Sequence, residues 1–451
     1  MIFVVRMSSI LIRGGVVVTM NDAFDIVAGD VSIRDGRIAA LGPDAADSGA
    51  HDTVIDAHGA WVLPGFIQTH VHLCQTLFRG YADDLPLMEW LRRCVWPMEA
   101  AHTATSLRAA ARLGITELLT SGTTTVLTME TVHDTDVVFE AAAESGIRAT
   151  IGKCMMDLDA GDDVPKRLQE TTAASLDESV AIGKRWDGAG QGRLRAAFAP
   201  RFAVSCTREL LEAVGSLSAA SRTLVHTHAS ESRDEIAIVK QLSGGLSNVE
   251  YLASLNLASP RLCAAHCVWS DDREQGLLAE HGVKVMHCPS SNLKLGSGIA
   301  PVAGMRARGI TVSLGADGAA CNNHLDMFTE MRLAALLQAV QRGPGALPAR
   351  DALWMATRAG ALTLGLEDEI GSIEAGKRAD LILIDRDGPH LVPGPDPYST
   401  IVYAARATDV RTTIVDGQLL VDARTPVRMD WAEIAAEARA AARDLAARAG
   451  V

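Results

Sequence analysis

The stretch "PGFIQTHVH", residues 64–72, joins two parts of the chain that differ in their residue pattern. Before it, residues 8–63 carry alternating or β-branched runs between Asn-Asp, Gly-Asp and Asp-Gly turns, a pattern typical of short strands. Within it, an apolar run ends in His70 and His72. Because alternate side chains of a strand point to the same face, these two imidazoles can reach one ion. The stretch therefore predicts a buried strand that ends in a candidate metal site.

Further short apolar runs follow this strand, and helical patterns separate most of them. The predicted strands span residues 65–72, 122–129, 147–155, 194–202, 223–231, 261–269, 283–291 and 310–318. Eight strands in roughly 300 residues, most of them followed by a helix, predict an α/β fold with a (β/α)₈ TIM-like barrel. A doubly wound open sheet is the alternative, but no Gly-x-Gly-x-x-Gly motif follows the first strand.

Strand-like runs return near the carboxyl end, in "GSIEAGKRADLILID" and "VRTTIVDGQLLVD". Short strands at both ends of the chain predict one small β-sandwich domain built from residues 1–63 and 366–428. The catalytic barrel then spans residues 64–365. An alanine-rich run over residues 429–451 predicts a C-terminal helix packed on the outside.

Composition limits the classes of protein that the chain can represent. It is 48% hydrophobic and 22% charged, which supports a sizeable core, and its net charge of -13 argues against nucleic acid or an anionic membrane as the main partner. The eight cysteines form no Cys-x-x-Cys pair, which favours buried free thiols in a reducing compartment. No secretory signal or spanning segment is evident, so we expect a soluble cytoplasmic protein whose start is Met1 or Met7.

Residues that bind metals or transfer protons recur at the ends of the predicted strands. Besides His70 and His72, these residues are His226, His228, Glu231, His266 and Asp317. The carboxyl ends of barrel strands converge on one face, so residues nearly 250 positions apart would meet there. Imidazoles and a carboxylate suit a divalent ion such as Zn²⁺, and a glutamate outside the ligand set can carry protons.

A single histidine on a strand is more often a hydrogen-bonded core residue than a ligand. Four strand ends that each supply a suitable residue favour the metal site over that interpretation. His226 and His228 point the same way by strand parity, and we expect His228 to be the ligand and His226 to support it from behind.

The runs "PGFIQTHVH", "HASE", "AAHCVW", "HCPSSNLKLGSGIAPV" and "LGADGAACNNHLDMFTEMRLAALLQ" resemble the amidohydrolase superfamily, in its branch of adenosine-type deaminases and s-triazine hydrolases. The resemblance covers nearly the full chain. It implies one divalent metal ion per subunit, zinc or alternatively iron, bound by His70, His72, His228 and Asp317. No lysine is placed to be carbamylated between two metals, which argues against a binuclear centre.

The same resemblance implies roles for the other residues at the strand ends. His266 would contact the attacking water or the substrate rather than serve as a firm ligand. Glu231 would carry protons to a ring nitrogen and to the leaving amine, and Asp317 could accept the proton of the water. These roles imply hydrolytic deamination of a cyclic amidine, with His266, Glu231 and Asp317 as the catalytic residues.

The segment "LFRGYADDLPLMEWLRRCVWPMEAAHT" resembles the pocket wall of 5'-methylthioadenosine/S-adenosylhomocysteine-type deaminases. There Trp90 would line the pocket and Glu99 would accept hydrogen bonds from both ribose hydroxyls. Two residues depart from that pattern. Arg201 stands where that family usually has a histidine, and Gln75 is more typical of branches that act on oxopurines, pterins or triazines. Both are predicted to contact the substrate.

The resulting hypothesis is a metal-dependent deaminase of an adenosine-like nucleoside, such as 5'-deoxyadenosine, 5'-methylthioadenosine or S-adenosylhomocysteine. The alternative within the class is a guanine, pterin or s-triazine aminohydrolase or chlorohydrolase. A non-catalytic barrel that serves as a structural subunit is disfavoured by the complete set of strand-end residues. We expect a small-molecule substrate, no nucleic-acid or membrane partner and, by analogy, a homo-oligomer. Lys153 and Arg167 are weaker candidates for the distal end of the substrate, and surface statistics favour a solvated position for each.

Overall fold

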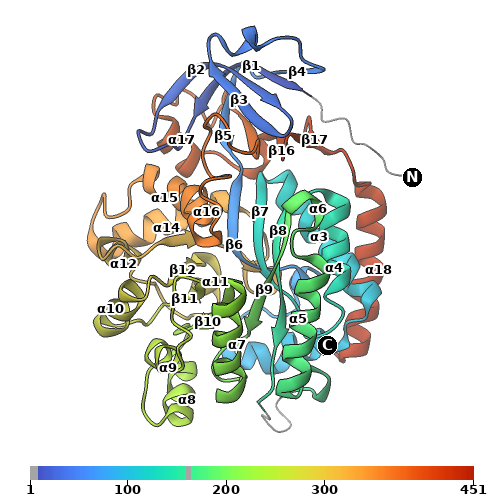
Figure 1. Cartoon of the computed structure of the whole chain (residues 1–451), viewed down its shortest axis with the longest axis vertical. Coiled ribbons are helices and arrows are strands. Elements are labelled where there is room, and N and C mark those ends of the chain that lie inside the picture. The colour runs from blue at the N-terminus through green and yellow to red at the C-terminus, as the bar shows by residue number, and fades with distance from the viewer. Residues whose placement is uncertain (1–8, 159–163) are drawn as a thin grey trace.

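A computed structural model describes residues 9–158 and 164–451 of the chain. The expectation about Met1 and Met7 concerns residues outside the described ranges. The fold is mixed α/β, with a sheet of strands from both chain ends stacked on a larger helix-covered part (Figure 1).

Strands from the two ends of the chain form one sheet. Within the described residues this sheet has nine strands in the order β18-β17-β16-β15-β5-β1-β2-β3, with β4 paired to β1. Its strands are β1 (Ile10–Val18), β2 (Ile26–Arg34), β3 (Arg37–Gly42), β4 (Thr53–Asp56), β5 (Ala60–Pro64), β15 (Leu381–Asp385), β16 (Val410–Val415), β17 (Gln418–Asp422) and β18 (Thr425–Pro426). The antiparallel pairing of β5 with β15 joins the two ends of the chain.

The second sheet is parallel and curled, consistent with a TIM-like barrel. Within the described residues it has nine strands in the order β13-β12-β11-β10-β9-β8-β7-β6-β14. Its strands are β6 (Phe66–His72), β7 (Thr123–Met129), β8 (Arg148–Met155), β9 (Leu194–Pro200), β10 (Val225–Ala229), β11 (Leu262–His266), β12 (Lys284–His287), β13 (Val312–Leu314) and β14 (Asp317–Gly318). Every predicted strand of the middle region is present, and the last is split in two.

A glycine with no room for a side chain lies at the split in the last predicted strand. Gly315, between β13 and β14, lies against the backbone of His70, and a Cβ there would lie 2.6 Å from the carbonyl oxygen of that residue. β13 pairs with β12, whereas β14 pairs with β6. The chain therefore changes partners at this glycine and brings Asp317 beside the end of β6.

Helices follow the sheet strands and cover the outside of the curled sheet (Figure 1). They are α1 (Leu87–Trp90), α2 (Trp96–Ala101), α3 (Ala104–Thr120), α4 (Asp136–Ser145), α5 (Thr172–Trp186), α6 (Ala189–Gly192), α7 (Arg208–Ser221), α8 (Arg233–Ser243), α9 (Asn248–Ser254), α10 (Asp272–Glu280), α11 (Pro289–Lys294), α12 (Val302–Ala307), α13 (Ala319–Asn322), α14 (Met327–Arg342), α15 (Ala349–Ala356), α16 (Arg358–Leu364), α17 (Pro397–Tyr403) and α18 (Trp431–Ala449). Capping boxes begin several of them, with Ser232 and Glu235 at α8 as one case.

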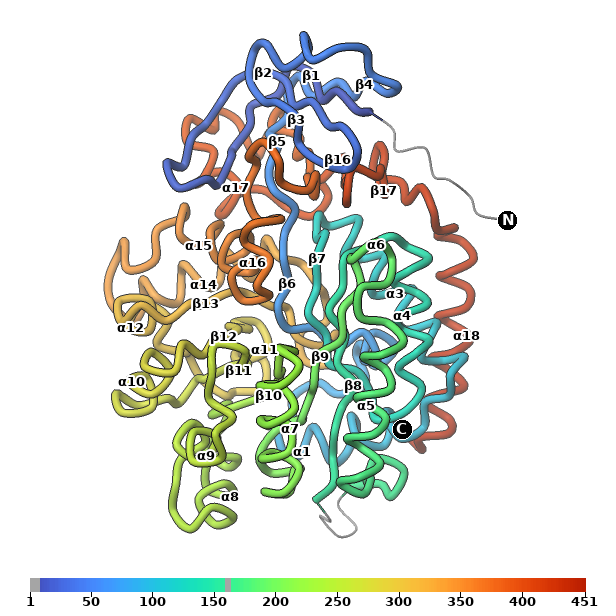
Figure 2. The backbone as a smooth tube through the Cα atoms, viewed as in Figure 1, coloured from blue at the N-terminus to red at the C-terminus, as the bar shows by residue number. Residues whose placement is uncertain are grey.

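The C-terminal helix α18 runs along α3 on the outside of the molecule (Figure 2). Arg112 of α3 fixes this contact, since its guanidinium lies 2.5 Å from Glu437 and 3.3 Å from Glu433 of α18. The C-terminal helix thus packs against α3 through charged as well as apolar contacts.

Two other expectations concern burial. All eight cysteines are free and buried, as predicted. In the described part of the chain, no helix combines the length and the apolar character that crossing a membrane requires. Lys153 corrects an expectation, because it is only 2% exposed and pairs with Glu170 at 2.5 Å instead of lying in solvent.

Candidate active site

Four predicted ligands come together where three strands of the curled sheet end. His70 and His72 lie at the end of β6, His228 on β10 and Asp317 at the start of β14. One ligand atom from each side chain lies within 4.8 Å of the ligand atoms of the others. The Nε2 atoms of His70 and His72 are each 3.2 Å from Oδ1 of Asp317. This spacing suits four atoms that surround one ion.

The outer ring nitrogen of each ligand histidine has a partner, which orients the other nitrogen toward the cluster. Facing a carbonyl, Nδ1 of His72 and of His228 must donate, and a His70 that binds an ion through Nε2 would donate from Nδ1 to His226 in the same way. The Nδ1 partners are Nε2 of His226 for His70 (2.6 Å), the carbonyl of Met129 for His72 (2.7 Å) and the carbonyl of Arg201 for His228 (2.7 Å). His226 therefore lies behind His70, in the supporting position outside the ligand set that was predicted for it.

The protonation of most of the cluster also suits a divalent cation. Burial lowers the pKa of His70 to about 4 and the pKa of His228 well below its usual value, so both rings are neutral at pH 7. Burial also acts against a charged His72, but the facing Asp317 outweighs it and raises the pKa of that ring, so a cation would have to displace its proton. Burial alone would raise the pKa of Asp317, but the facing His70 and His72 outweigh it and hold that pKa well below its usual range. The buried Nε2 of His70 has no hydrogen-bond partner among the described residues. Three imidazoles and a carboxylate are a fitting donor set for zinc, and two of the rings are already neutral.

Glu231 and His266 lie next to the metal ligands and face each other. Nε2 of His266 is 3.6 Å from Oε2 of Glu231 and 3.8 Å from Oδ2 of Asp317, while its Nδ1 donates to Oδ1 of Asn292 at 2.9 Å. Burial raises the pKa of Glu231 to about 7. A carboxyl group with that pKa can both release and take up a proton near neutral pH.

The backbone is strained where two of these side chains leave their strands. His266 has a φ of 72° and Asp317 a φ of 64°, backbone angles that residues other than glycine rarely adopt. Such strain persists only where surrounding contacts impose it, and it gathers at functional sites. Its position here agrees with a site at these strand ends.

Two residues at the site were not predicted from the sequence. Ser291 donates to Oδ2 of Asp317 at 2.6 Å, and Asn292 accepts from His266. Both lie on α11, directly after β12. Their position after a strand end was the signal available in the run "HCPSSN", but neither residue is a usual ligand or proton carrier.

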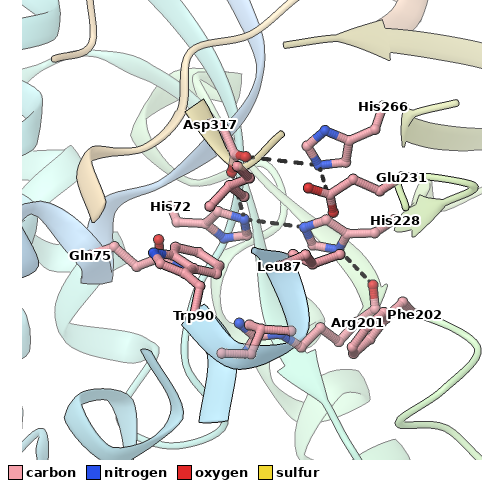
Figure 3. A pocket seen from close by; sticks show the side chains of 12 residues that line it. His72, Gln75, Leu87, Trp90, Arg201, Phe202, His228, Glu231, His266 and Asp317 are labelled. Atoms are coloured by element: carbon pink, nitrogen blue, oxygen red, sulfur yellow. Dashed lines mark hydrogen bonds and ion pairs between the residues drawn. The ribbon is translucent and has the colours of Figure 1, made fainter. Parts of the chain in front are cut away.

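A pocket opens over the cluster, and its wall comes from the segment after β6. Besides the metal-site residues, the pocket is lined by Gln75, Leu87, Trp90, Leu91, Arg201, Phe202 and Leu295 (Figure 3). The space between the lining atoms, open solvent included, is about 340 Å³. Gln75, Trp90 and Arg201 thus line the pocket, as the sequence predicted.

Glu99 lies behind this lining and is already engaged. Its carboxylate accepts from both terminal nitrogens of Arg201, at 2.5 and 3.2 Å, and from Nε2 of Gln75 at 3.0 Å. Burial acts against the charged guanidinium, but the facing Glu99 outweighs it and raises the pKa of Arg201. The buried Oε1 of Gln75 is left without a partner among the described residues. Glu99 can thus accept a substrate diol only by giving up one of these partners.

Comparison with known proteins gives a consistent result across the chain. Residues 61–420 match the model of the amidohydrolase family. A 5'-deoxyadenosine deaminase of Methanosarcina acetivorans is 41% identical over 98% of this chain and 100% of its own. A 5-methylthioadenosine/S-adenosylhomocysteine deaminase of Moorella thermoacetica is 40% identical over 96% of this chain and 98% of its own.

Solved structures show the same similarity. An adenosine deaminase from Xanthomonas campestris with bound zinc superposes with a TM-score of 0.91, at 33% identity over 97% of this chain and 98% of its own. An atrazine chlorohydrolase from Arthrobacter aurescens complexed with zinc has a TM-score of 0.89, at 29% identity over 96% of this chain and 100% of its own.

Proposed function

This chain belongs to the amidohydrolase family, and from that premise we propose that it is a zinc-dependent deaminase of an adenosine-like nucleoside. The substrate class is 5'-deoxyadenosine, 5'-methylthioadenosine or S-adenosylhomocysteine, and the products are the inosine analogue and ammonia. The observation that carries the proposal is the buried Glu231 beside a four-ligand cluster, both of them in the lining of one pocket. Two full-length relatives at about 40% identity, both named as deaminases of such nucleosides, support it.

His70, His72, His228 and Asp317 would hold the zinc ion. When bound there, zinc lowers the pKa of a coordinated water to about 7 and so supplies the nucleophile. Glu231 would donate a proton to the ring nitrogen beside the reacting carbon, which makes that carbon more electrophilic. Asp317 would pass the proton that it takes from the attacking water to Glu231, which would then protonate the departing amino group, so that it leaves as ammonia.

His266 would contact the attacking water or the substrate in this scheme. Its Nδ1 hydrogen bond to Asn292 fixes the ring, and its Nε2 faces Glu231 and Asp317. Trp90 would stack against the purine, because its side chain lines the same pocket as the metal ligands and lies beside His72 (Figure 3). Arg201 and the open Oε1 of Gln75 would meet polar groups of the substrate.

Glu99 is the residue on which the nucleoside assignment depends. To accept both ribose hydroxyls it must release Gln75 or one arm of Arg201. The freed amide of Gln75 would then bind the base. A bare oxopurine, pterin or triazine would instead leave the Gln75–Glu99–Arg201 contacts intact and pair with Gln75 alone. Because these three residues are already paired in the structure, a guanine, pterin or s-triazine aminohydrolase or chlorohydrolase is the second candidate.

The closure of the curled sheet and the form of the terminal sheet are also part of the proposal. We propose that the curled sheet closes as a (β/α)₈ barrel over residues 64–365, because β13 and β14 at its two ends are separated by only two residues. One apolar cluster supports this closure, since it joins side chains of several strands to α16. The cluster includes Ile67, Leu127, Ala197, Cys263, Met286 and Leu364.

The terminal sheet would fold over as a β-sandwich of residues 1–63 and 366–428, followed by the C-terminal helix of residues 429–451. A backbone hydrogen bond from Ile38 of β3 to Lys377 supports the folding-over, because it links the edge strand to the segment just before β15. A homo-oligomer, the absence of a nucleic-acid partner and a cytoplasmic location stay predictions.

An ammonia-release screen of the zinc-loaded protein tests the function. The substrates are 5'-deoxyadenosine, 5'-methylthioadenosine, S-adenosylhomocysteine, adenosine, guanine, pterin and an aminotriazine, with chloride release from a chlorotriazine measured in parallel. The proposal expects the highest kcat/KM on a 5'-modified adenosine. Activity confined to the free bases or triazines would transfer the assignment to the second candidate.

The role of Glu99 can be tested separately with a pair of nucleosides. 5'-Deoxyadenosine has the diol, whereas 2',5'-dideoxyadenosine lacks one hydroxyl. If Glu99 binds the diol, the protein should prefer 5'-deoxyadenosine by about tenfold or more, equivalent to roughly 1.4 kcal/mol. Glu99→Gln should abolish that preference. A preference unchanged in Glu99→Gln would assign the diol to another residue.

A further inference from the structure

A second cavity lies at the end of the curled sheet opposite to the metal cluster. Arg195 lies near the start of β9, Arg261 just before β11 and Lys284 at the start of β12, whereas the ligand histidines lie at the carboxyl ends of β6 and β10. The cavity has a free volume of about 1680 Å³, including solvent at its mouth. None of its lining residues belongs to the active-site pocket.

Four cationic side chains line this cavity, and none of them forms an ion pair within the described parts of the chain. They are Arg195, Arg222, Arg261 and Lys284. Arg261 donates from Nε to Oγ of Ser218 at 3.1 Å, which leaves its charge uncompensated. Asp187 and Glu367 are the acidic residues of the lining, and a carboxylate oxygen of Asp187 already accepts from the backbone N–H of Ala196 at 3.3 Å. The lining therefore carries two more positive than negative charges.

This local charge is opposite to that of the whole protein, whose net charge is -13. Elsewhere arginines such as Arg112, Arg148 and Arg378 each pair with carboxylates. Like charges around one hollow repel each other, and low-dielectric walls strengthen the positive potential inside it. An anion bound in the hollow would remove that repulsion.

We propose that this cavity binds a phosphate-bearing small molecule with at least two negative charges. Three arginines favour phosphate, because guanidinium groups donate to its oxygens in pairs. The volume exceeds the needs of a single phosphate and accommodates a polyphosphate chain or a nucleotide. The hydroxyls of Ser221 and Thr223 lie in the same lining and add neutral donors. The proposal is independent of the reaction at the metal site.

Isothermal titration calorimetry on the zinc-loaded protein at about 150 mM KCl tests the proposal, since that ionic strength screens diffuse attraction. The probes are tripolyphosphate and uridine triphosphate, which lacks the adenine that the active site would accept. The zinc content is measured after each titration, because polyphosphates chelate zinc. Saturable binding with a stoichiometry near one per chain is the expected result. Tighter binding of uridine triphosphate indicates a nucleotide site, and equal binding indicates recognition of the phosphates alone; both support the proposal.

Arg222→Ala combined with Lys284→Ala is the decisive variant. It should weaken binding by about tenfold or more, because it removes two charged donors. It should retain deaminase activity, since both residues lie at the far end of the sheet from the metal ligands, and retained activity shows that it folds. Arg443→Ala is the matched control, an exposed arginine of α18 remote from the cavity lining. No saturable binding, or equal weakening in the control, would overturn the proposal.

Discussion

At the scale of single residues, the metal site depends on groups that never touch the ion. Each ligand histidine is held by a partner at Nδ1, and Asp317 is held by Ser291. These partners fix both the ring orientation and the tautomer of each ligand. Losing a partner should therefore misplace the ligand and weaken metal binding.

His226 allows this effect to be measured with two variants that differ in one property. His226→Gln retains an acceptor for the Nδ1 hydrogen of His70, whereas His226→Leu removes it. We expect His226→Leu to weaken zinc binding by about 10- to 100-fold and His226→Gln to lose much less. Competition with a fluorescent zinc chelator measures both. Equal affinities in the two variants would contradict an orienting role for His226.

Glu231 gives the test of the chemistry itself. Glu231→Gln keeps the size of the side chain but cannot transfer a proton, so kcat should fall by about 10²- to 10⁴-fold while the zinc content stays unchanged. Ammonia release and metal analysis measure the two quantities. Glu280→Gln, at the exposed end of α10, is the control. Near-normal turnover in Glu231→Gln would remove Glu231 from the proton transfer.

The four ligands were predictable because each is a characteristic residue type at a strand end. The contacts among Gln75, Glu99 and Arg201 were not, although all three were named as substrate contacts. A sequence shows which residues carry charge, but it does not show that Arg201 and Glu99, more than 100 positions apart, face each other. Pairing of this kind is decided by the three-dimensional packing of the pocket wall.

At the scale of elements, the helix α14 is hydrogen-bonded to the short helices beside the active site. Glu330 of α14 accepts from Oγ of Ser290 at 2.5 Å, from the backbone N–H of Ser290 at 3.1 Å and from Asn322 at 2.9 Å. It thereby ties α14 to α11 and α13, the two short helices that follow β12 and β14. Burial raises the pKa of Glu330 to about 8.

This pKa predicts a pH dependence of stability. Between its unfolded value of 4.5 and about 8, Glu330 keeps a proton in the folded protein that the unfolded chain has released. Raising the pH through this range therefore lowers the free energy of unfolding, by at most about 1.4 kcal/mol per pH unit. Urea unfolding of the zinc-loaded protein at pH 5 to 8 should show this slope, and Glu330→Gln should reduce it. Equal slopes in both proteins would refute the assignment.

The predicted strands of the middle region are all present. Each is a continuous apolar run between turns, and such a run is stable only when the fold buries it. The predicted single strand over residues 310–318 was wrong in detail, since the chain changes partners at Gly315. The short π-helix Leu91–Val95 that continues the pocket wall from Trp90 was not predicted. Its form depends on the packing of that wall, which local pattern does not encode.

At the scale of the whole molecule, a buried ionic network joins the two sheets. Arg148 at the start of β8 donates to both oxygens of Asp380, just before β15, at 2.7 and 3.0 Å. Asp380 also accepts from the backbone N–H of Asp416 at 2.8 Å, and Asp416 pairs with Arg378. The terminal sheet and the curled sheet are thus linked by charge as well as by apolar packing.

Arg148→Met would leave Asp380 buried without its cation. We expect a loss of about 3–5 kcal/mol in the free energy of unfolding, measured by urea denaturation with tryptophan fluorescence. Arg185→Met breaks an exposed pair with Asp136 and should cost about 1 kcal/mol or less. The double variant Arg148→Met with Asp380→Asn should recover part of the loss. A loss no larger than that of Arg185→Met would show that the network contributes little to stability.

The pairing of β5 with β15 has a consequence for biosynthesis. β5 leaves the ribosome roughly 300 residues before its partner strand, which at about 5–20 residues per second means a wait of roughly 15–60 seconds. During that time β1 to β5 have hydrogen-bonding edges but lack the strands that complete their sheet. The nascent chain is therefore exposed to edge-to-edge aggregation until its last quarter has been made. A holding chaperone, or slower growth at low temperature, should raise the yield of folded protein.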